Sequence, residues 1–224
     1  MRRHIFIGDV HGCIDEVREL LSLLEVTPGD VAVATGDLTR KGPAADRCVE
    51  LWRDRRYLSV LGNNDAKMLS RARRWHSRMF ARRADRVVLR RGDLIDEIAR
   101  WPLLLEFVEA GVIVVHGGVL PDGSCPREAA LELRYIRRDG DAWCIVPKGN
   151  EQRGDRFWSE VWDGDRIVVY GHTPQREPKI DRRAIGLDTG CVYGGKLSAA
   201  IFESPKEWTI AGVQARRAYS GSHL

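Results

Sequence analysis

Apolar and polar positions alternate in blocks along the first third of the chain. Short apolar runs that favour strands are each followed by a stretch with helical spacing. The apolar runs lie at 4–8, 31–36 and 57–62, and the stretches with helical spacing lie at 14–25, 43–54 and 64–84. Strand-then-helix alternation is typical of layered α/β proteins. The pattern therefore predicts an α/β fold.

The second half of the chain contains more predicted strands than helices. Its apolar runs lie at 111–118, 166–173, 184–190, 196–204 and 207–212. One helix-like stretch covers 127–138, whereas the polar, glycine-rich residues 139–157 are expected to be irregular. The strands of this half predict a second sheet, so the fold class is α/β with α+β character. All of residues 1–212 are expected to form a single domain. A polar tail over 213–224 is expected to fray.

Composition narrows the class of protein. The 224 residues suffice for one well-buried domain, and 43% hydrophobic with 30% charged residues is ordinary for a globular protein. No apolar run is long enough to span a membrane, and MRRHIFIGDVHG at the N-terminus lacks the hydrophobic centre of a signal peptide. The sequence thus predicts a cytoplasmic location. Five cysteines without C-x-x-C spacing favour reduced thiols over a disulfide framework or a zinc site.

Positive charge is concentrated in one segment. The chain carries a net charge of +4, but residues 67–91 contain ten Lys and Arg and a single acid, Asp85. Such a block attracts phosphate chains or an RNA backbone, and it is also typical of a solvated helix face. An RNA- or polyanion-binding protein that uses Trp75 and Phe80 as stacking platforms is therefore one hypothesis.

Polar side chains follow the apolar runs at the points where the predicted strands end. The segments are GDVHG (8–12), GDLTRKGP (36–43), GNND (62–65), HGG (116–118) and GHT (171–173). Ligands in layered α/β folds bind beyond the carboxyl ends of strands, so these segments are expected to converge. Their carboxylate, imidazole and amide groups suit Mn, Fe or Zn, and an aspartate shared by two ions is typical of two-metal phosphoryl chemistry. The candidate ligands are Asp9, His11, Asp37, Asn63, His116 and His172.

The order of these motifs, GD-x-HG, GD-x-x-x-x-GP, GN-x-[DE], HGG and GHT, resembles that of the calcineurin-like metallophosphoesterases. The resemblance covers residues of about 4–203, and GHT without a further histidine is similar to the phosphoprotein-phosphatase branch. It implies a four-layer α/β/β/α sandwich with a dinuclear metal site at the strand carboxyl ends. By matched position, the first ion would be held by Asp9, His11 and Asp37. The second would be held by Asp37, Asn63, His116 and His172.

Within that branch the chain is most similar to the symmetrical diadenosine tetraphosphatase (ApaH) and ApaH-like phosphatase group. The similarity lies in GLDTGCVYGGKLSAAIFES, in WSEVWDGDRIVVYGHTP, and in Lys41 in place of the usual arginine. It implies that LRYIRR (133–138) supplies a phosphate-binding arginine, with Arg137 as the best match and Arg138 as its rival. A guanidinium can bind two phosphate oxygens at once, whereas Lys41 would act as a point charge.

Asn64 departs from the family pattern. Most relatives have a histidine after the metal-binding asparagine, and that histidine, paired with an aspartate, is assigned as the acid that protonates the leaving group. The Asn64 amide can hydrogen-bond to phosphate but has no proton to give. Asp65, in the acidic position of the motif, is expected to be ionised unless it is buried. Loss of a general acid costs about 10²–10⁴-fold, and it harms poor leaving groups such as the serine alkoxide most.

Together these features predict a dinuclear metal-dependent phosphohydrolase of ApaH-like type. The predicted substrate is a nucleoside polyphosphate such as diadenosine tetraphosphate, with Lys41, Arg137 and Asn64 on its phosphate oxygens. Mn is the first expectation for the two divalent ions, with Fe, Zn, Co and Ni as alternatives. The alternative functions are a broad-specificity protein phosphatase, a polyphosphatase, and a non-catalytic metal sensor that binds polyanions or RNA. A phosphoprotein and an RNA 5′ end are the alternative partners. The sequence leaves the oligomeric state open.

Overall fold

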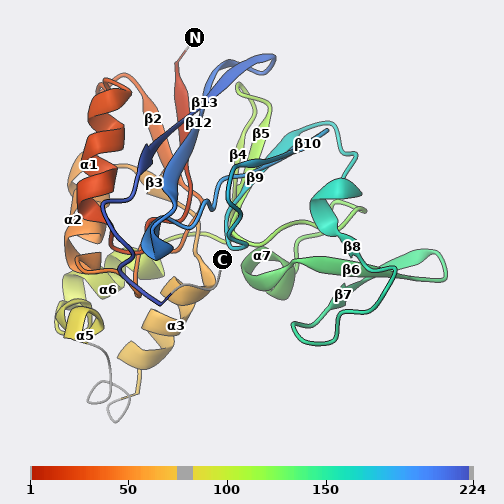
Figure 1. Cartoon of the computed structure of the whole chain (residues 1–224), viewed down its shortest axis with the longest axis horizontal. Coiled ribbons are helices and arrows are strands. Elements are labelled where there is room, and N and C mark those ends of the chain that lie inside the picture. The colour runs from red at the N-terminus through yellow and green to blue at the C-terminus, as the bar shows by residue number, and fades with distance from the viewer. Residues whose placement is uncertain (1, 75–82, 222–224) are drawn as a thin grey trace.

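Two five-stranded sheets form the centre of the molecule and lie face to face (Figure 1). The computed structural model describes residues 2–74 and 83–221. The first sheet has the order β13-β12-β1-β2-β3, built from β1 (His4–Ile7), β2 (Val31–Ala34), β3 (Leu58–Ser59), β12 (Lys196–Ser204) and β13 (Glu207–Gln214). The second has the order β10-β11-β9-β5-β4, built from β4 (Leu104–Phe107), β5 (Val112–Val115), β9 (Ile167–Tyr170), β10 (Lys179–Asp181) and β11 (Ala184–Gly186).

Each sheet also has an outer layer (Figure 1). Helices pack on the outer side of the first sheet, namely α1 (Ile14–Leu23), α2 (Ala45–Arg55), α3 (Asn63–Ala72), α5 (Arg83–Leu89) and α6 (Gly92–Ala99). The second sheet is covered by a helix and a small three-stranded sheet, namely α7 (Arg127–Glu132), β6 (Tyr135–Asp139), β7 (Ala142–Val146) and β8 (Arg156–Phe157). Two 3-10 turns complete the described elements, η1 (Trp158–Glu160) and η2 (Cys191–Tyr193).

Side chains of the central strands alternate between two apolar cores. Phe6 and Val33 of the first sheet meet Val114 and Val169 of the second in the core between the sheets. Their neighbour Ile5 faces the outer helices instead. Because both faces of both sheets are covered, the strands are apolar at nearly every position, as the sequence pattern indicates. The predicted four-layer α/β/β/α sandwich is confirmed, with the small sheet as an addition to its fourth layer.

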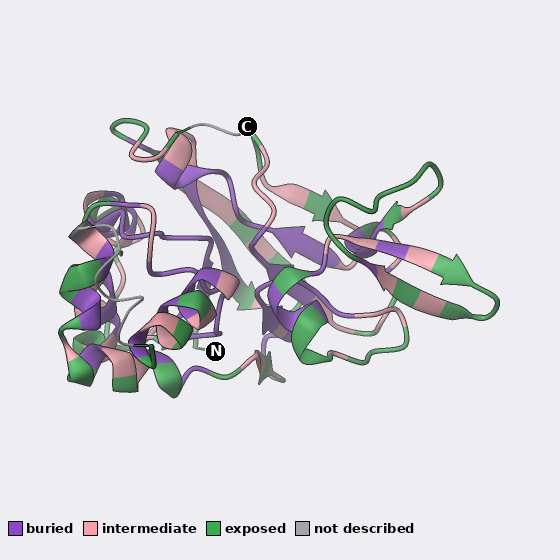
Figure 2. Cartoon of the chain, turned by 90° about the horizontal axis from the view of Figure 1, so that it is seen from below, coloured by how far each residue is buried: buried purple, intermediate pink, exposed green. Residues whose placement is uncertain are grey.

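The segment after α7 differs from the sequence prediction. A helix was expected over 127–138, but α7 ends at Glu132 and β6 begins at Tyr135. The prediction was wrong because the dipeptide Asp139-Gly140 opens a tight turn, with Gly140 at φ 57°, that pairs β6 with β7. The stretch 139–157, expected to be irregular, contains β7 and β8. This hairpin lies at the right of Figure 2 and exposes much of its surface.

The C-terminal residues up to 221 do not fray as expected. β13 ends at Gln214, and the next residues pack beside α1 and η2. Glu16, fully buried in α1, accepts hydrogen bonds from the backbone N–H of Arg216 (3.0 Å) and the hydroxyl of Tyr219 (2.7 Å). Across residues 2–74 and 83–221, no helix combines the length and the apolar character that a membrane span needs.

Candidate active site

The loops that carry the predicted metal ligands meet at one end of the two sheets. β1, β2 and β3 run parallel in the first sheet, and β5 and β9 run parallel in the second. The backbone N–H of His172, after β9, donates to both carboxylate oxygens of Asp9, after β1, at 3.2 Å. Within the first sheet, the His11 N–H donates to the Asp37 carbonyl at 2.7 Å. The structure thus brings together loops that are up to 163 residues apart.

Backbone strain is concentrated in these loops. Seven described non-glycine residues have a positive φ, and five of them belong to this region. Three are predicted ligands, His11 (φ 47°), Asp37 (φ 53°) and His172 (φ 71°), and the others are Arg40 and Lys41. Left-handed backbone is uncommon for such residues and often marks functional sites, where the surrounding structure maintains the strain. The sequence pattern gave no sign of this feature.

Two glycines allow the loops to approach each other closely. A Cβ atom on Gly171 would lie 2.0 Å from Asp9 Oδ1, and one on Gly62 would lie 2.2 Å from Asp37 Oδ1. Both distances are far inside van der Waals contact. These positions therefore require glycine so that the backbone can lie directly beside a carboxylate.

The histidine rings are oriented by backbone carbonyls. His11 Nδ1 donates to the Thr39 carbonyl (3.1 Å), and His116 Nδ1 donates to the Thr35 carbonyl (2.8 Å). The Nε2 atom of each ring therefore carries the lone pair and lies 3.5 Å from an Asp37 carboxylate oxygen. Such second partners fix the tautomer of metal-binding histidines. Burial lowers the pKa of His11 to about 4, which keeps its ring neutral, as a ligand must be.

The buried polar atoms of this cluster fit divalent metal ions. Nε2 of His116 and Nε2 of His172 are buried, and neither has a hydrogen-bond partner among the described residues. Asp9, Asp37 and His116 each present a ligand atom within 4.8 Å of the others. Unpaired buried nitrogen and carboxylate atoms are costly unless something binds them. The residues present therefore match the nitrogen and oxygen donors of a transition-metal centre.

The two aspartates differ in electrostatic environment. Burial, with the nearby charges of Asp188 and Asp37, raises the pKa of Asp9 well above its usual value. Burial opposes ionisation of Asp37 as well, but the imidazoles of His116 and His11 and a hydrogen bond from Asn64 hold its pKa below the usual range. Asp37 lies between the two imidazoles, as a carboxylate shared by two ions would. A bound cation would offset the repulsion between the aspartates.

Asn64 positions two predicted ligands. Its amide Nδ2 donates to Asp37 Oδ2 (2.5 Å) and to Asn63 Oδ1 (2.8 Å), and its backbone N–H donates to Asp37 Oδ1 (2.8 Å). Its own Oδ1 accepts a hydrogen bond from Arg40 Nη1 at 3.1 Å. Asn64 therefore links the ligand cluster to a guanidinium that the sequence analysis did not select.

Asp65 is completely buried at the start of α3. It accepts hydrogen bonds from Thr39, through the backbone N–H (3.0 Å) and the hydroxyl (2.7 Å), and from the Gly62 N–H (3.2 Å). Burial, opposed in part by these donors, raises its pKa to about 7. These contacts fix the turn between β3 and α3, so the structure favours a positioning role for Asp65. The catalytic role predicted for Asp65 from its place in the GNND motif is untested by these contacts and stays a prediction.

Basic pockets border the cluster. A pocket of about 490 Å³ is lined by Arg40, Lys41, Asn64, Arg71, Asp85, Tyr193, Ser220 and Gly221. Lys41 Nζ lies 2.9 Å from His11 Nε2, directly beside the predicted ligands. A second pocket, of about 220 Å³, is lined in part by Asn63, His172, Lys67, Arg134, Lys148, Glu128 and Glu132. A third shares Arg40 and Arg71 with the first and Lys67 with the second. Trp75 and Phe80 lie outside the described residues.

The arginine beside the cluster is Arg134 rather than Arg137. Arg134 lines the pocket that contains Asn63 and His172. Arg137 instead donates to both carboxylate oxygens of Asp155, at 2.7 and 2.9 Å, and Arg138 lies over the ring of Trp143. Neither lines the three pockets described above. Arg134 was not predicted because the resemblance of LRYIRR to the family segment pointed to Arg137 and Arg138. In the expected helix over 127–138 the three arginines would share one face, so the local pattern could not distinguish them.

With this geometry in view, comparisons with known proteins identify the family. The model of the calcineurin-like phosphoesterases matches residues 3–208. This chain belongs to the calcineurin-like phosphoesterase family. The predicted family and the predicted class, a metal-dependent phosphohydrolase, are therefore confirmed.

Members with similar sequences are named as bis(5'-nucleosyl)-tetraphosphatases, of both the asymmetrical and the symmetrical type. An asymmetrical bis(5'-nucleosyl)-tetraphosphatase PrpE of Halalkalibacterium halodurans is 31% identical, over 88% of this chain and 88% of the relative. A symmetrical bis(5'-nucleosyl)-tetraphosphatase of Vibrio cholerae is 29% identical, over 93% of this chain and 98% of the relative. A crystal structure provisionally assigned as a diadenosine tetraphosphatase superimposes with a TM-score of 0.82 at 30% identity, over 96% of this chain and 94% of that chain.

Proposed function

We propose that this phosphoesterase uses two divalent metal ions to hydrolyse phosphoanhydride bonds of nucleoside polyphosphates, with diadenosine tetraphosphate as the reference substrate. The observation that carries the proposal is the set of neighbouring pockets beside the ligand cluster, which share lining residues and carry more basic than acidic side chains. The names of the relatives and of the similar crystal structure support the same substrate class.

The pockets suit a substrate with several phosphates. Arg40, Lys41 and Arg71 line one pocket, and Lys67 and Arg134 line another. Arg40 and Arg71 share the single carboxylate of Asp85, and Lys67 lies 3.7 Å from Glu132, so the first pocket keeps more positive than negative charge. The single phosphate of a phosphoserine residue would contact only part of this basic lining. A dinucleoside tetraphosphate extends a chain of anionic groups beyond the phosphorus that is attacked. Charge-assisted hydrogen bonds to such a chain are stronger than neutral ones, so the pockets favour a polyphosphate.

The proposed roles follow from position. Asp9, His11 and Asp37 would hold one ion, and the second would be held by Asp37, Asn63, His116 and His172. Two such ions would supply a nucleophile at neutral pH and neutralise phosphoryl charge, with Mn as the first expectation. Lys41 and Arg134 bind and orient the phosphate oxygens from two sides of the cluster. Asn64 keeps Asp37 and Asn63 in place through its amide.

Product analysis with diadenosine tetraphosphate tests the proposal. The Mn-loaded protein is expected to convert it either to two ADP or to ATP and AMP, and chromatography of the nucleotides separates the two patterns. Either pattern supports the proposal and shows which anhydride bond is attacked. A chelator-treated sample is the control. Hydrolysis of p-nitrophenyl phosphate or of phosphotyrosine without any cleavage of the dinucleotide would overturn the proposal in favour of a broad-specificity phosphatase.

A further inference from the structure

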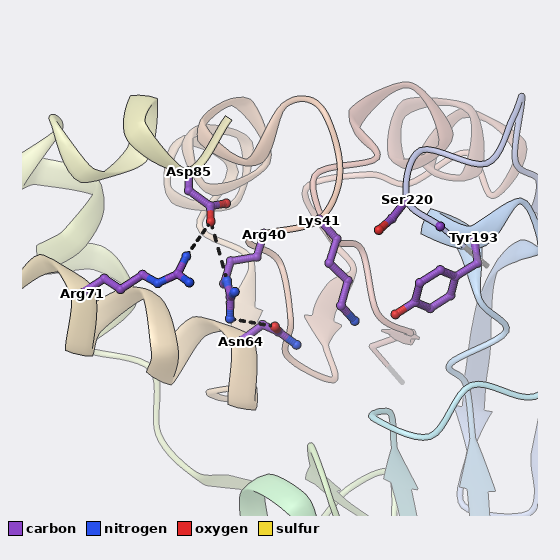
Figure 3. Close-up of a pocket in the computed structure, with 8 residues that line it drawn as sticks. Arg40, Lys41, Asn64, Arg71, Asp85, Tyr193 and Ser220 are labelled. Atoms are coloured by element: carbon purple, nitrogen blue, oxygen red, sulfur yellow. Dashed lines mark hydrogen bonds and ion pairs between the residues drawn. The ribbon is translucent and has the colours of Figure 1, made fainter. Parts of the chain in front are cut away.

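Arg40 reaches the position where a general acid would act. Its Nη1 donates to the side-chain oxygen of Asn64 at 3.1 Å, and Asn64 in turn contacts Asp37 (Figure 3). Asn64 stands where most of the family has a proton-donating histidine. The side chain that faces this position is therefore a guanidinium, which stays protonated at every working pH.

Asp85 positions Arg40 at the edge of the pocket. One carboxylate oxygen of Asp85 lies 3.7 Å from Arg40 Nε and 3.0 Å from Arg71 Nη1, as the dashed lines in Figure 3 show. Asp85 is almost fully buried, with a side chain that is 1% exposed, whereas 20% of the Arg40 side chain is exposed. Because Asp85 contacts Arg40 through Nε, the Nη atoms at the end of the guanidinium can contact other groups. Nη1 contacts Asn64.

The pocket beyond Arg40 carries excess positive charge. Arg40, Lys41 and Arg71 line it together with a single acid, Asp85. Lys41 Nζ lies 5.1 Å from the centre of the Tyr193 ring, on the opposite side of the pocket from Arg71 in Figure 3. A volume of about 490 Å³ is sufficient for a phosphate group and further linked atoms. The pocket therefore suits the anionic group that departs from the attacked phosphorus.

The chemistry of an anhydride makes a fixed charge useful here. An oxygen of water forms a bond to phosphorus while the bond between phosphorus and the bridging oxygen breaks. The bonding electron pair stays on the leaving phosphate, and the proton displaced from the water passes to solvent. A terminal phosphate has a second pKa near 6, so it departs as an anion without receiving a proton. What it needs is a positive group placed where the charge develops.

We propose that the guanidinium of Arg40 stabilises the leaving phosphate of the cleaved anhydride, in place of a proton donor. This inference rests on the proposed function and deepens it, because it predicts a preference for anhydrides over esters. A leaving alkoxide such as that of serine requires a proton, which Arg40 and Asn64 do not supply. A leaving phosphate requires neutralisation, which Arg40 supplies together with Lys41 and Arg71.

The test compares two substrates in one variant. Arg40→Ala is expected to lower kcat for diadenosine tetraphosphate about 10²–10³-fold and kcat for p-nitrophenyl phosphate less than about tenfold, because only the first leaving group is a phosphate. Retained turnover of p-nitrophenyl phosphate also shows that the variant folds and holds its metals. Arg40→Lys is expected to recover part of the loss. Arg91→Ala, which removes a guanidinium paired with Glu50 and Asp93, is the matched control and should change neither rate.

The outcomes separate the inference from the function on which it rests. Equal losses on both substrates, or no loss on the dinucleotide, would overturn the role of Arg40 while leaving the proposed function intact. If the unmodified protein cleaves inorganic tripolyphosphate but no dinucleotide, the proposed nucleoside polyphosphate substrate is wrong. The role of Arg40 is then tested by comparing the effect of Arg40→Ala on tripolyphosphate and on p-nitrophenyl phosphate. If it cleaves no anhydride, both proposals are wrong.

A binding experiment gives a readout that is independent of turnover. Pyrophosphate is titrated calorimetrically into chelator-treated protein, so that only the side chains of the chain contribute. Arg40→Ala is expected to weaken binding about 10–100-fold, as loss of a charge-assisted hydrogen bond does. Unchanged affinity would contradict the inference.

A double variant reverses the inferred specificity. Arg40 Nη1 lies 3.1 Å from Asn64 Oδ1, so the two side chains point toward each other. Arg40→Asp with Asn64→His replaces this guanidinium and amide by a carboxylate and an imidazole that can donate a proton. This pair is expected to raise the rate on phosphoserine relative to the dinucleotide. Asn64→His alone should raise it less, because the adjacent guanidinium disfavours the protonated ring. A rise of the same size in the single variant would contradict the role of Arg40.

Discussion

The ligand cluster and the small outer sheet are built in opposite ways. Five of the six predicted ligands lie on short loops at one end of the two buried sheets, and Asn63 begins α3. Hydrogen bonds with backbone groups orient His11, His116 and Asp9. The outer sheet of β6, β7 and β8 is instead a partly exposed hairpin with a third short strand. In the proposed function the two regions have different roles. The buried loops would hold the metal ions, and Arg134, which lines a pocket with Asn63 and His172, would bind phosphate from the segment that leads into the outer sheet.

The largest expected effect comes from removing a ligand in the buried cluster. Asp37→Asn or His116→Ala is expected to lower kcat/KM by more than about 10²-fold, since even the outer partners of metal ligands are worth about 10–100-fold. Mn content after gel filtration is measured on the same samples and should fall together with activity. Asp93→Asn, a change of the same charge at an exposed site, is the control. Full activity in either ligand variant would refute the assignment of the cluster.

A smaller effect on kcat/KM is expected from the arginines around β6, and it distinguishes Arg134 from Arg137. Arg134→Ala is expected to lower kcat/KM about 10–100-fold by removing a charged donor to phosphate. Arg137→Ala should leave kcat/KM nearly unchanged, because Arg137 is paired with Asp155. Steady-state kinetics on diadenosine tetraphosphate compares the two. The reverse order would show that Arg137 leaves Asp155 to bind substrate.

Metal removal is expected to reveal a stability penalty in the buried cluster. The pKa of Asp9 is raised in the folded state, so its ionisation destabilises the metal-free protein as pH rises through that raised value. Asp9→Asn should therefore raise Tm of the chelator-treated protein at pH 7.5, with each kcal/mol worth about 2–4 °C. The same variant should lose the increase in Tm that Mn produces. A lower Tm without metal would contradict the electrostatic account.

The smallest effect is expected at the outer sheet itself. The hydrogen bond from Arg137 holds the pKa of Asp155 below its usual value, so the pair stabilises the fold above the ordinary aspartate pKa of about 3.9. That contribution is lost as pH falls through the lower folded value. Asp155→Asn should therefore lower Tm slightly at pH 7 and at pH 5, and the difference should shrink only at about pH 2, below the ordinary aspartate pKa. A difference that is independent of pH would show that Asp155 acts through packing.

The same contrast explains what the sequence could predict. The ligand loops follow strands that are mostly buried, and their glycines and polar residues stand out against apolar runs. Asp37 and His116 could therefore be selected before any coordinates, and the family and fold followed from the order of the motifs. Residues 133–139, which lead into and form β6, show no such contrast between apolar and polar positions. The strand β6 reads YIRRD, and its polar residues also fit a helix.

Arg40 shows a second limit of sequence reasoning. It directly precedes Lys41, and the analysis selected only the lysine because the resemblance covered that position. The left-handed backbone at both residues, φ 69° and φ 62°, determines where the two side chains lie, and no local pattern predicts it. The partner Asp85 is 45 residues further along the chain, so the Arg40–Asp85 pair becomes visible only in the fold.

The ratio of kcat/KM for diadenosine tetraphosphate to that for a phosphoserine peptide tests the central claim most directly. Both substrates are measured on one Mn-loaded sample, so the metal content cancels. We expect the ratio to exceed about 10², since loss of a general acid costs about 10²–10⁴-fold and affects the ester far more than the anhydride. Equal rates, or faster turnover of phosphoserine, would contradict the claim that this site is built for phosphoanhydrides.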